Sequence, residues 1–408
     1  MKKPKKNYWE ERSRMSNIPK LRFPEFKGEW EEKKLSDFMT RLTRKNSNNE
    51  SSRALTISSV DGLIDQGEFF KKQIASKDTS GYYLLKNGDF AYNKSYSVGY
   101  DYGSIKRLDR YEDGVVSTLY ICMTLTSDTN SDYLTHYFDS MKWNKSVSGI
   151  SAEGARNHGL LNIPTESFFQ TKHFLAPTLA EQQKIADFLS NVDSIITAET
   201  KILNTLQKKK KALMQKLFTQ QLRFKSDDGT DFPAWEEKKL GECVEILDSQ
   251  RKPIESKERA NRKGEYPYYG ASGIIDYIDD YLFEGESILL GEDGANIINR
   301  NSRLAFIAKG KYWVNNHAHI MKANADNLNY FICEYLESLD YSKICAGSAQ
   351  PKLTQDVIRN LIINAPCKEE QQKIADCLSS LDSLIQTQQK VVTTWQQRKK
   401  ALLQQMFI

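Results

Sequence analysis

Two stretches of the chain place apolar residues three, four or seven positions apart, a spacing that predicts long α-helices with one apolar stripe. Between residues 178 and 221 these positions are Ile185, Phe188, Val192, Ile195, Ile202, Leu206, Leu213 and Leu217. Between residues 367 and 408 they are Ile374, Cys377, Leu381, Leu384, Val391, Trp395, Leu402 and Met406. About 39 residues at about 1.5 Å each give a helix of about 58 Å, which exceeds a globular core. We therefore expect two coiled-coil helices that pair antiparallel.

The rest of the chain shows shorter patterns, rich in Tyr, Gly and Asn. Runs of β-branched and apolar residues predict strands at 54–60, 115–125, 287–290 and 303–308. Amphipathic stretches near 131–147 and 326–345 predict one late helix in each block. The predicted fold class is α+β, with a basic segment 1–29, a mixed α/β head 30–177, a helical spacer 178–221, a second head 222–366 and a second spacer 367–408.

An internal repeat supports this order. The sequence Trp-Glu-Glu-Lys-Lys-Leu at 30–35 recurs at 235–240, an offset of 205 residues. Glu-Gln-Gln-Lys-Ile-Ala-Asp at 181–187 recurs at 370–376, an offset of 189 that also relates Lys210 to Lys399. The constant offset within the spacers means that neither copy has an insertion or deletion, as expected where packing fixes the length of a helix. The fall of the offset from 205 to 189 means that the second head is shorter than the first. An ordinary helical hairpin would show the same apolar spacing, but the repeat favours a pseudo-twofold spacer between two heads.

Composition limits the possible classes of protein. The net charge is +5, and residues 1–29 carry all of that excess, so any DNA binding must come from local basic patches. No apolar run reaches the roughly 18 residues of a membrane span, and the basic N-terminal segment lacks the apolar core of a secretory signal. The six cysteines form no Cys-x-x-Cys pair. We expect a cytoplasmic protein with reduced thiols and no membrane contact.

The sequence contains none of the common catalytic motifs. A phosphate-binding loop, the His-Glu-x-x-His zinc motif, the Gly-x-Ser-x-Gly nucleophile elbow and a dinucleotide fingerprint are all missing from it. The Asn-Pro-Pro-aromatic tetrapeptide of amino-methyltransferases is missing too. His317 and His319 are a tight pair, but no third metal ligand lies near them in sequence. We expect no catalytic residue, no metal and no cofactor.

Several loops mix the residue types that read DNA, since base edges need hydrogen-bonding side chains and phosphates need cations. In the first head the candidate DNA-binding residues are Lys94, Tyr96, Arg156, Asn157 and His158. In the second head they are Tyr269, Ser272, Asn296, Arg300, His317, Gln350 and Lys352. Each loop could instead be a plain surface turn, and Tyr269 could pack the core. A scaffold that presents two protein-binding or ligand-binding heads without DNA recognition is the alternative.

Over essentially its whole length the sequence resembles the specificity subunits of Type I restriction-modification systems. The segments that carry the resemblance are the doubled Trp-Glu-Glu-Lys-Lys-Leu, the doubled Pro-x4-Gln-Gln-x-Ile-Ala at 177 and 366, and the second-head segments 268–274, 288–294 and 315–319. The first head departs from the second at 84–94 and 155–159, so we expect the two heads to read different half-sites.

The resemblance implies that the heads are target-recognition domains for a bipartite double-stranded DNA site. It also implies two partner modification subunits, which bind S-adenosylmethionine and methylate adenine N6, and ATP-dependent restriction subunits.

Overall fold

A computed structural model describes residues 17–70, 76, 78–126, 128–151, 159, 161–345 and 351–408. The chain forms two compact units. The first unit comprises residues 1–200 and 391–408, and the second comprises residues 201–390. Each unit therefore contains one head and parts of both long helices.

The first unit is built around an antiparallel four-stranded sheet in the order β2 (Met39–Arg41), β9 (Ile121–Leu125), β6 (Phe90–Asn93), β7 (Ser104–Arg107). Pairs of strands accompany it: β1 (Glu31–Lys34) with β10 (Lys172–Leu175), β3 (Leu55–Ser58) with β4 (Gly62–Asp65), and β5 (Tyr83–Lys86) with β8 (Asp113–Val116). The short helices are α1 (Leu35–Phe38), α2 (Gln66–Phe69), α3 (Ser131–Asp139), α4 (Asn144–Ser148) and α5 (Thr165–Phe169). Buried aromatic side chains such as Tyr92, Phe138 and Trp143 fill the core.

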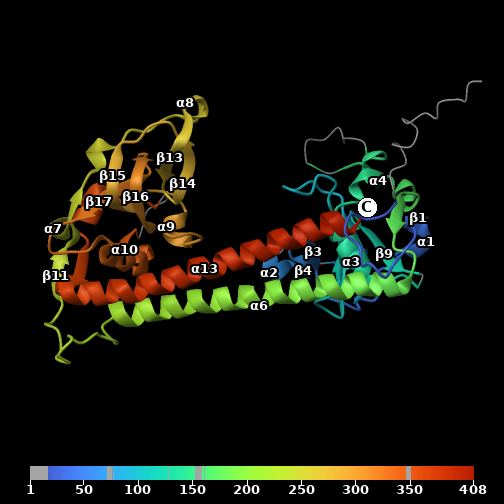
Figure 1. Ribbon diagram of the computed structural model, residues 1–408, viewed down its shortest axis with the longest axis horizontal. Coiled ribbons are helices and arrows are strands. Elements are labelled where there is room, and N and C mark those ends of the chain that lie inside the picture. The colour runs from blue at the N-terminus through green and yellow to red at the C-terminus, as the bar shows by residue number, and fades with distance from the viewer. Residues whose placement is uncertain are drawn as a thin grey trace, which may run out of the picture. The chain divides into compact units, whose positions relative to one another are not determined.

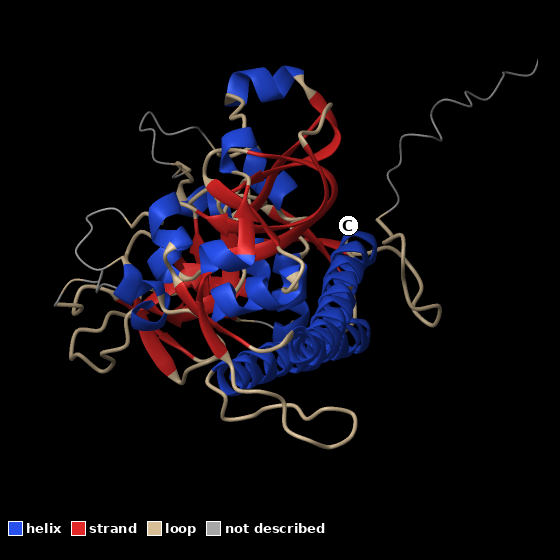
Figure 2. Ribbon diagram, turned by 90° about the vertical axis from the view of Figure 1, so that its left-hand side faces the viewer, coloured by secondary structure: helices blue, strands red, loops and turns tan. Residues whose placement is uncertain are grey.

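The second unit contains a six-stranded sheet in the order β12 (Val244–Ile246), β17 (Ala318–Ala323), β15 (Phe283–Gly291), β16 (Ala305–Val314), β13 (Lys263–Gly270), β14 (Gly273–Ile278). Only β13 and β16 run parallel among these neighbours. A separate pair joins β11 (Glu236–Lys239) to β18 (Ile362–Ala365). The helical elements are α7 (Leu240–Cys243), η1 (Asp248–Gln250), α8 (Ser256–Asn261), α9 (Asn296–Asn299), α10 (Asn329–Ser338), α11 (Tyr341–Ile344) and α12 (Gln355–Arg359). Helix α10 packs on β15 and β16, and Figure 2 shows the mixture of helices and strands in the chain.

Two long helices, α6 (Leu179–Phe218) and α13 (Lys368–Met406), each run through both units and appear in Figure 1 as uninterrupted coils. In the first unit the start of α6 packs on the end of α13, through Ile185, Leu189 and Leu403. In the second unit the end of α6 packs on the start of α13, through Leu217 and Ile374. The helices are therefore antiparallel, and the predicted fold class is confirmed. No helix in the described ranges has an apolar stretch long enough to cross a membrane.

The seam between the long helices differs from the predicted one. Ile202 was expected in it, but this side chain is 47% exposed, and the neighbouring Leu203 is buried instead. The same shift makes Val392 buried next to the half-buried Val391. Steps of four and three residues from Ile185 reach the buried Leu203 and then position 210, which is a lysine. A prediction that follows only apolar residues avoids this lysine and therefore misplaces the middle of the seam. Of the other predicted residues, Val192 and Ile374 are buried, and Leu206, Leu213, Leu381, Trp395 and Leu402 are half-buried.

The two predicted late helices are each interrupted. The stretch 131–147 forms α3 and α4, and Met141 between them has a φ of +61°, which ends the first helix. The stretch 326–345 likewise forms α10 and α11. In both heads the longer helix packs on the sheet, as an amphipathic pattern requires.

Candidate nucleic-acid interface

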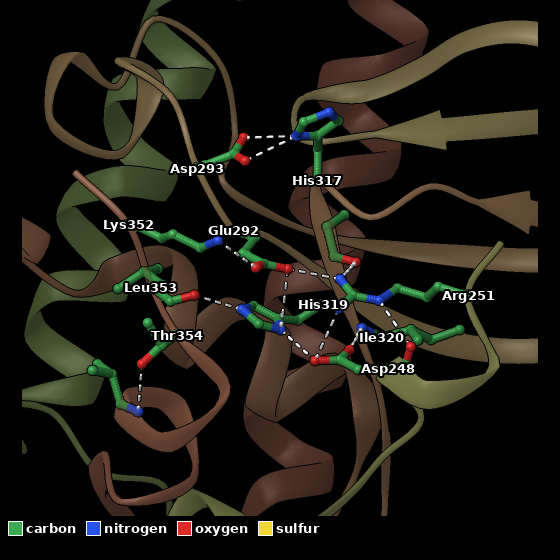
Figure 3. Close-up of polar contacts among 12 residues, drawn as sticks. Asp248, Arg251, Glu292, Asp293, His317, His319, Ile320, Lys352, Leu353 and Thr354 are labelled. Atoms are coloured by element: carbon green, nitrogen blue, oxygen red, sulfur yellow. Dashed lines mark hydrogen bonds and ion pairs between the residues drawn. The ribbon is translucent and has the colours of Figure 1, made fainter. Parts of the chain in front are cut away.

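The second head brings together three loops that the sequence suggested separately (Figure 3). Strands β15 and β17 pair with Gly291 opposite Ala318, so the loop after β15 lies beside the turn before β17. Asp293 in the first loop accepts a hydrogen bond from His317 Nδ1 at 2.9 Å. Lys352 comes from a third segment, forms a β-bridge with Asp293 and places its Nζ 3.2 Å from Glu292 Oε1. His317 and Lys352 are exposed, which leaves their polar ends available to a ligand.

A buried polar cluster lies beneath these loops (Figure 3). Asp248 is 2.6 Å from His319 Nδ1 and accepts the Ile320 N–H at 3.0 Å. Burial alone would raise the pKa of Asp248, but the hydrogen bond from His319 and nearby positive charge hold this pKa below its ordinary value. The other ring nitrogen of His319, Nε2, is 2.7 Å from the Leu353 carbonyl oxygen. Each ring nitrogen of His319 therefore lies at hydrogen-bond distance from an acceptor group, which fixes the ring from both sides.

Arg251 joins this cluster to the loops. Its Nη1 donates to Glu292 at 2.8 Å and to the Ala318 carbonyl at 2.7 Å. Glu292 therefore forms ion pairs both with Arg251 of the buried cluster and with Lys352 of the exposed loops. The two histidines of the predicted pair contact different carboxylates. His317 contacts Asp293 near the surface, and His319 contacts the buried Asp248. The buried layer is connected to the exposed loops through Arg251 and Glu292.

The other second-head candidates fall into two groups. Ser272 is exposed in the turn between β13 and β14, whereas Tyr269 is half-buried against Phe306 and Tyr312, and this burial raises its pKa. Asn296 closes its own loop through two hydrogen bonds with the main chain of Ser302. Arg300 binds Glu337 at 2.7 Å, so its guanidinium is turned toward α10. Gln350 lies outside the described residues.

In the first head the two predicted loops also meet. The Tyr96 N–H donates to the Gly159 carbonyl at 2.7 Å, and the Leu161 N–H donates to the Lys94 carbonyl at 3.0 Å. Tyr96 is exposed, while Lys94 is half-buried, and desolvation lowers its pKa. No carboxylate of the described ranges forms an ion pair with Lys94. Arg156, Asn157 and His158 lie outside the described residues.

Sequence reasoning missed Arg41 and the cleft beside it. Arg41 is the last residue of β2, and among the described residues no carboxylate pairs with it. It lines a cleft of about 870 Å³ together with residues of α5, with Gln170 just after that helix and with Lys172 of β10. These residues are far apart in the chain, so no local pattern could have grouped them.

Each head is anchored to a long helix by an equivalent buried cluster. In the first unit Glu181 accepts hydrogen bonds from Arg22 Nε at 2.6 Å and from Trp30 Nε1 at 3.1 Å. In the second unit Glu370 accepts from Arg223 Nη2 at 2.6 Å and from Trp235 Nε1 at 3.0 Å. These contacts explain why Trp and Glu recur at fixed places in both repeats.

Comparison with known proteins places these features in a family context. A family sequence model described as "Type I restriction modification DNA specificity domain" matches residues 234–394, which include most of the second head with its converging loops. A type I restriction enzyme specificity subunit of Haemophilus influenzae is 35% identical over 148 residues, or 36% of this chain and 37% of that protein. The chain thus aligns with little more than a third of that relative's length.

Two further proteins match over more of the chain. The MjaVIII specificity subunit of Methanocaldococcus jannaschii is 26% identical over 296 residues, or 66% of this chain and 68% of that one. The crystal structure of a Type I restriction-modification S subunit from M. genitalium superimposes with a TM-score of 0.57, covering 96% of this chain and 99% of that chain at 14% identity. At that identity the superposition establishes a shared fold.

Proposed function

Because the chain belongs to the family of Type I restriction-modification specificity subunits, we propose that it is the non-catalytic subunit that selects the DNA target. In this proposal each head is a target-recognition domain that reads one half of a bipartite double-stranded site. The observation that carries the proposal is the convergence of Asp293, His317 and Lys352 on one exposed surface of the head that matches the family domain. A carboxylate, an imidazole and an ammonium together supply acceptors and donors for base edges and a cation for phosphate.

The proposed partners are two modification subunits, which methylate adenine N6, and ATP-dependent restriction subunits, all in the cytoplasm. The spacer helices support a role in assembly, because Ile195, Ile202 and Leu384 are apolar yet exposed. The test is methylome sequencing of a cell that carries this chain with its modification subunits. We expect a bipartite methylated motif that disappears when the chain is deleted. Heads that bind only proteins or small ligands would give no such motif.

Exchange of residues 30–177 for the matching block of a relative should change one half of the methylated motif and leave the other half intact. The reason is that each head has its own core and its own anchor on a spacer helix. Methylome sequencing of the exchange variant measures this directly. The reciprocal exchange of 222–366 is the matched control and should change the other half. A single exchange that altered both halves would contradict independent reading.

Substitutions in the loops should separate base contacts from phosphate contacts. Arg156→Ala or Gln350→Ala should cost about 1–3 kcal/mol and relax specificity in one half-site, if the side chain binds a base edge. Lys94→Ala or Lys352→Ala should weaken binding to all sequences and reduce the salt slope by about one unit. The measurement is binding of the assembled methylase to matched and half-mismatched duplexes over a salt series. Lys343→Ala, at an exposed lysine of α11, is the control. If none of the four loop variants differed from it, these assignments would be wrong.

A further inference from the structure

Two valines of the first head are exposed to an unusual degree. Val60 is 81% exposed and Val98 is 91% exposed, the largest fractions among the large apolar side chains of the described residues. A single exposed apolar residue needs no explanation. Here, however, both valines occupy the tips of tight turns, and the two turns are bonded to each other.

The turn that carries Val60 joins β3 to β4 and is held rigidly. Ser58 pairs with Gly62 across the turn. The Ser58 hydroxyl accepts the Asp61 N–H at 3.0 Å and donates to the Asp61 carboxylate at 2.8 Å. Gly62 has a φ of +83°, a left-handed backbone conformation that glycine adopts readily. Val60 therefore lies at the tip of a turn that is closed by hydrogen bonds and strand pairing.

The turn that carries Val98 runs from Ser97 to Tyr100. The Tyr100 N–H donates to the Ser97 carbonyl at 2.8 Å, and Gly99 has a φ of +82°. The Ser97 hydroxyl lies 3.1 Å from the Ser59 hydroxyl, which in turn donates to Ser104 at 3.1 Å. Ser59 precedes Val60 and Ser97 precedes Val98, so this hydrogen bond joins the two turns that carry the valines. We call Val60 and Val98 the valine tips.

The surroundings of the valine tips favour DNA as the occupant. Val98 shares its loop with the exposed Tyr96 and with Lys94, which has no ion-pair partner among the described carboxylates. The Lys94 ammonium attracts phosphate, whereas Asp61, next to Val60, would be repelled by it. An apolar side chain cannot pair with phosphate, so the base edges are the part of DNA that a valine can contact favourably. The apolar group displayed by bases in the major groove is the C5-methyl of thymine, and apolar side chains contact it.

We propose that Val60 and Val98 recognise thymine C5-methyl groups in the half-site read by the first head. This inference rests on the proposed function, because it assigns a specific chemical group to a head that reads DNA. Valine has few rotamers and hydrogen bonds close both turns, so little conformational entropy is lost on contact. The tips thus supply specificity by shape and apolar contact, beside the polar contacts expected from the same loop.

The test replaces each thymine of the first half-site, one at a time, by deoxyuridine, which lacks only the C5-methyl group. Binding is measured with the full chain assembled with its modification subunits. For at least one thymine we expect about three- to tenfold weaker binding, the effect of one buried methyl group. In the Val60→Ala, Val98→Ala double variant, binding to the thymine duplex should weaken similarly, and deoxyuridine should cause no further loss.

Two control variants accompany this measurement. Val357→Ala removes an exposed valine on α12 of the second head and should leave the deoxyuridine effect in the first half-site unchanged. Val98→Ile keeps an apolar tip and should retain sensitivity to deoxyuridine. The two control variants test whether the effect of the Val60→Ala, Val98→Ala substitutions comes from the loss of apolar contact at the valine tips.

Undiminished sensitivity to deoxyuridine in the double variant would overturn the inference. So would a first half-site in which no thymine responds to deoxyuridine. In both cases wild-type binding to its own target remains sequence-specific, and the proposed function stands. If the wild-type assembly bound matched and mismatched duplexes equally, the proposed function would fail and the inference with it.

Discussion

Replacement of Phe407 by alanine should destabilise the first unit by about 3–5 kcal/mol, the usual effect of removing a fully buried aromatic ring. Phe407 follows the end of α13, is almost completely buried, and contacts three aromatic rings of the first head. Its centroid is 5.4 Å from Tyr133, 5.8 Å from Tyr137 and 6.1 Å from Trp30. A residue near the end of the printed sequence thus completes the core of a head that begins near residue 30.

Hydrogen exchange read by mass spectrometry can test this in the full chain. We expect lost protection in the first unit, above all around Tyr133 and Tyr137, and retained protection in residues 201–390. Phe218→Ala is the matched control, because Phe218 lies 189 residues earlier and contacts Phe331 and Tyr335 of the second head at 5.8 and 5.3 Å. Phe218 is only partly buried, so its loss should cost less and should affect the second unit. Unchanged protection in the Phe407 variant would contradict this account.

The repeated segments predicted the fold well because their signals are local. A heptad pattern is visible within one helix, and the repeat of Glu181 as Glu370 located both helix starts. The middle of the seam was misplaced because Lys210 and Lys399 occupy core-facing positions. Lys210 Nζ is 2.6 Å from Asp382, and Lys399 Nζ is 2.6 Å from Asp193. A lysine buried by ion pairing cannot be distinguished from a solvated lysine in a sequence.

The candidate site was predictable only in part, for a similar reason. Glycine, asparagine and charged residues located the loops, but residue type does not show which way a side chain turns. His317 and Arg300 looked equally suitable for DNA contact, yet His317 is exposed and Arg300 is bound to Glu337. The valine tips were not predicted, because the prediction of DNA contacts relied on polar and charged side chains. Their exposure depends on two turns that lie more than 30 residues apart in the chain.

Removal of the Glu181 carboxylate should also cost the first unit about 3–5 kcal/mol, since it leaves a buried cation without its partner. Glu181 is 1% exposed and Arg22 is 9% exposed at the side chain, so water can replace the lost contact only in part. Trp30 would lose the acceptor for its indole N–H as well. We therefore expect Glu181→Leu to lower the free energy of unfolding, measured by chemical denaturation, and to expose the segment around Arg22 to hydrogen exchange.

The equivalent cluster of the second unit provides an internal comparison. Glu370→Leu should be milder, because Arg223 is 27% exposed and water can solvate its guanidinium in part. The double variant Arg22→Met, Glu181→Leu should recover much of the stability lost in Glu181→Leu, because an apolar pair leaves no buried charge unpaired. That recovery separates the cost of an orphaned charge from the cost of lost packing. If the effects of Arg22→Met alone and Glu181→Leu alone were additive in the double variant, the charge pair would not stabilise this cluster, and packing around Trp30 would have to do so.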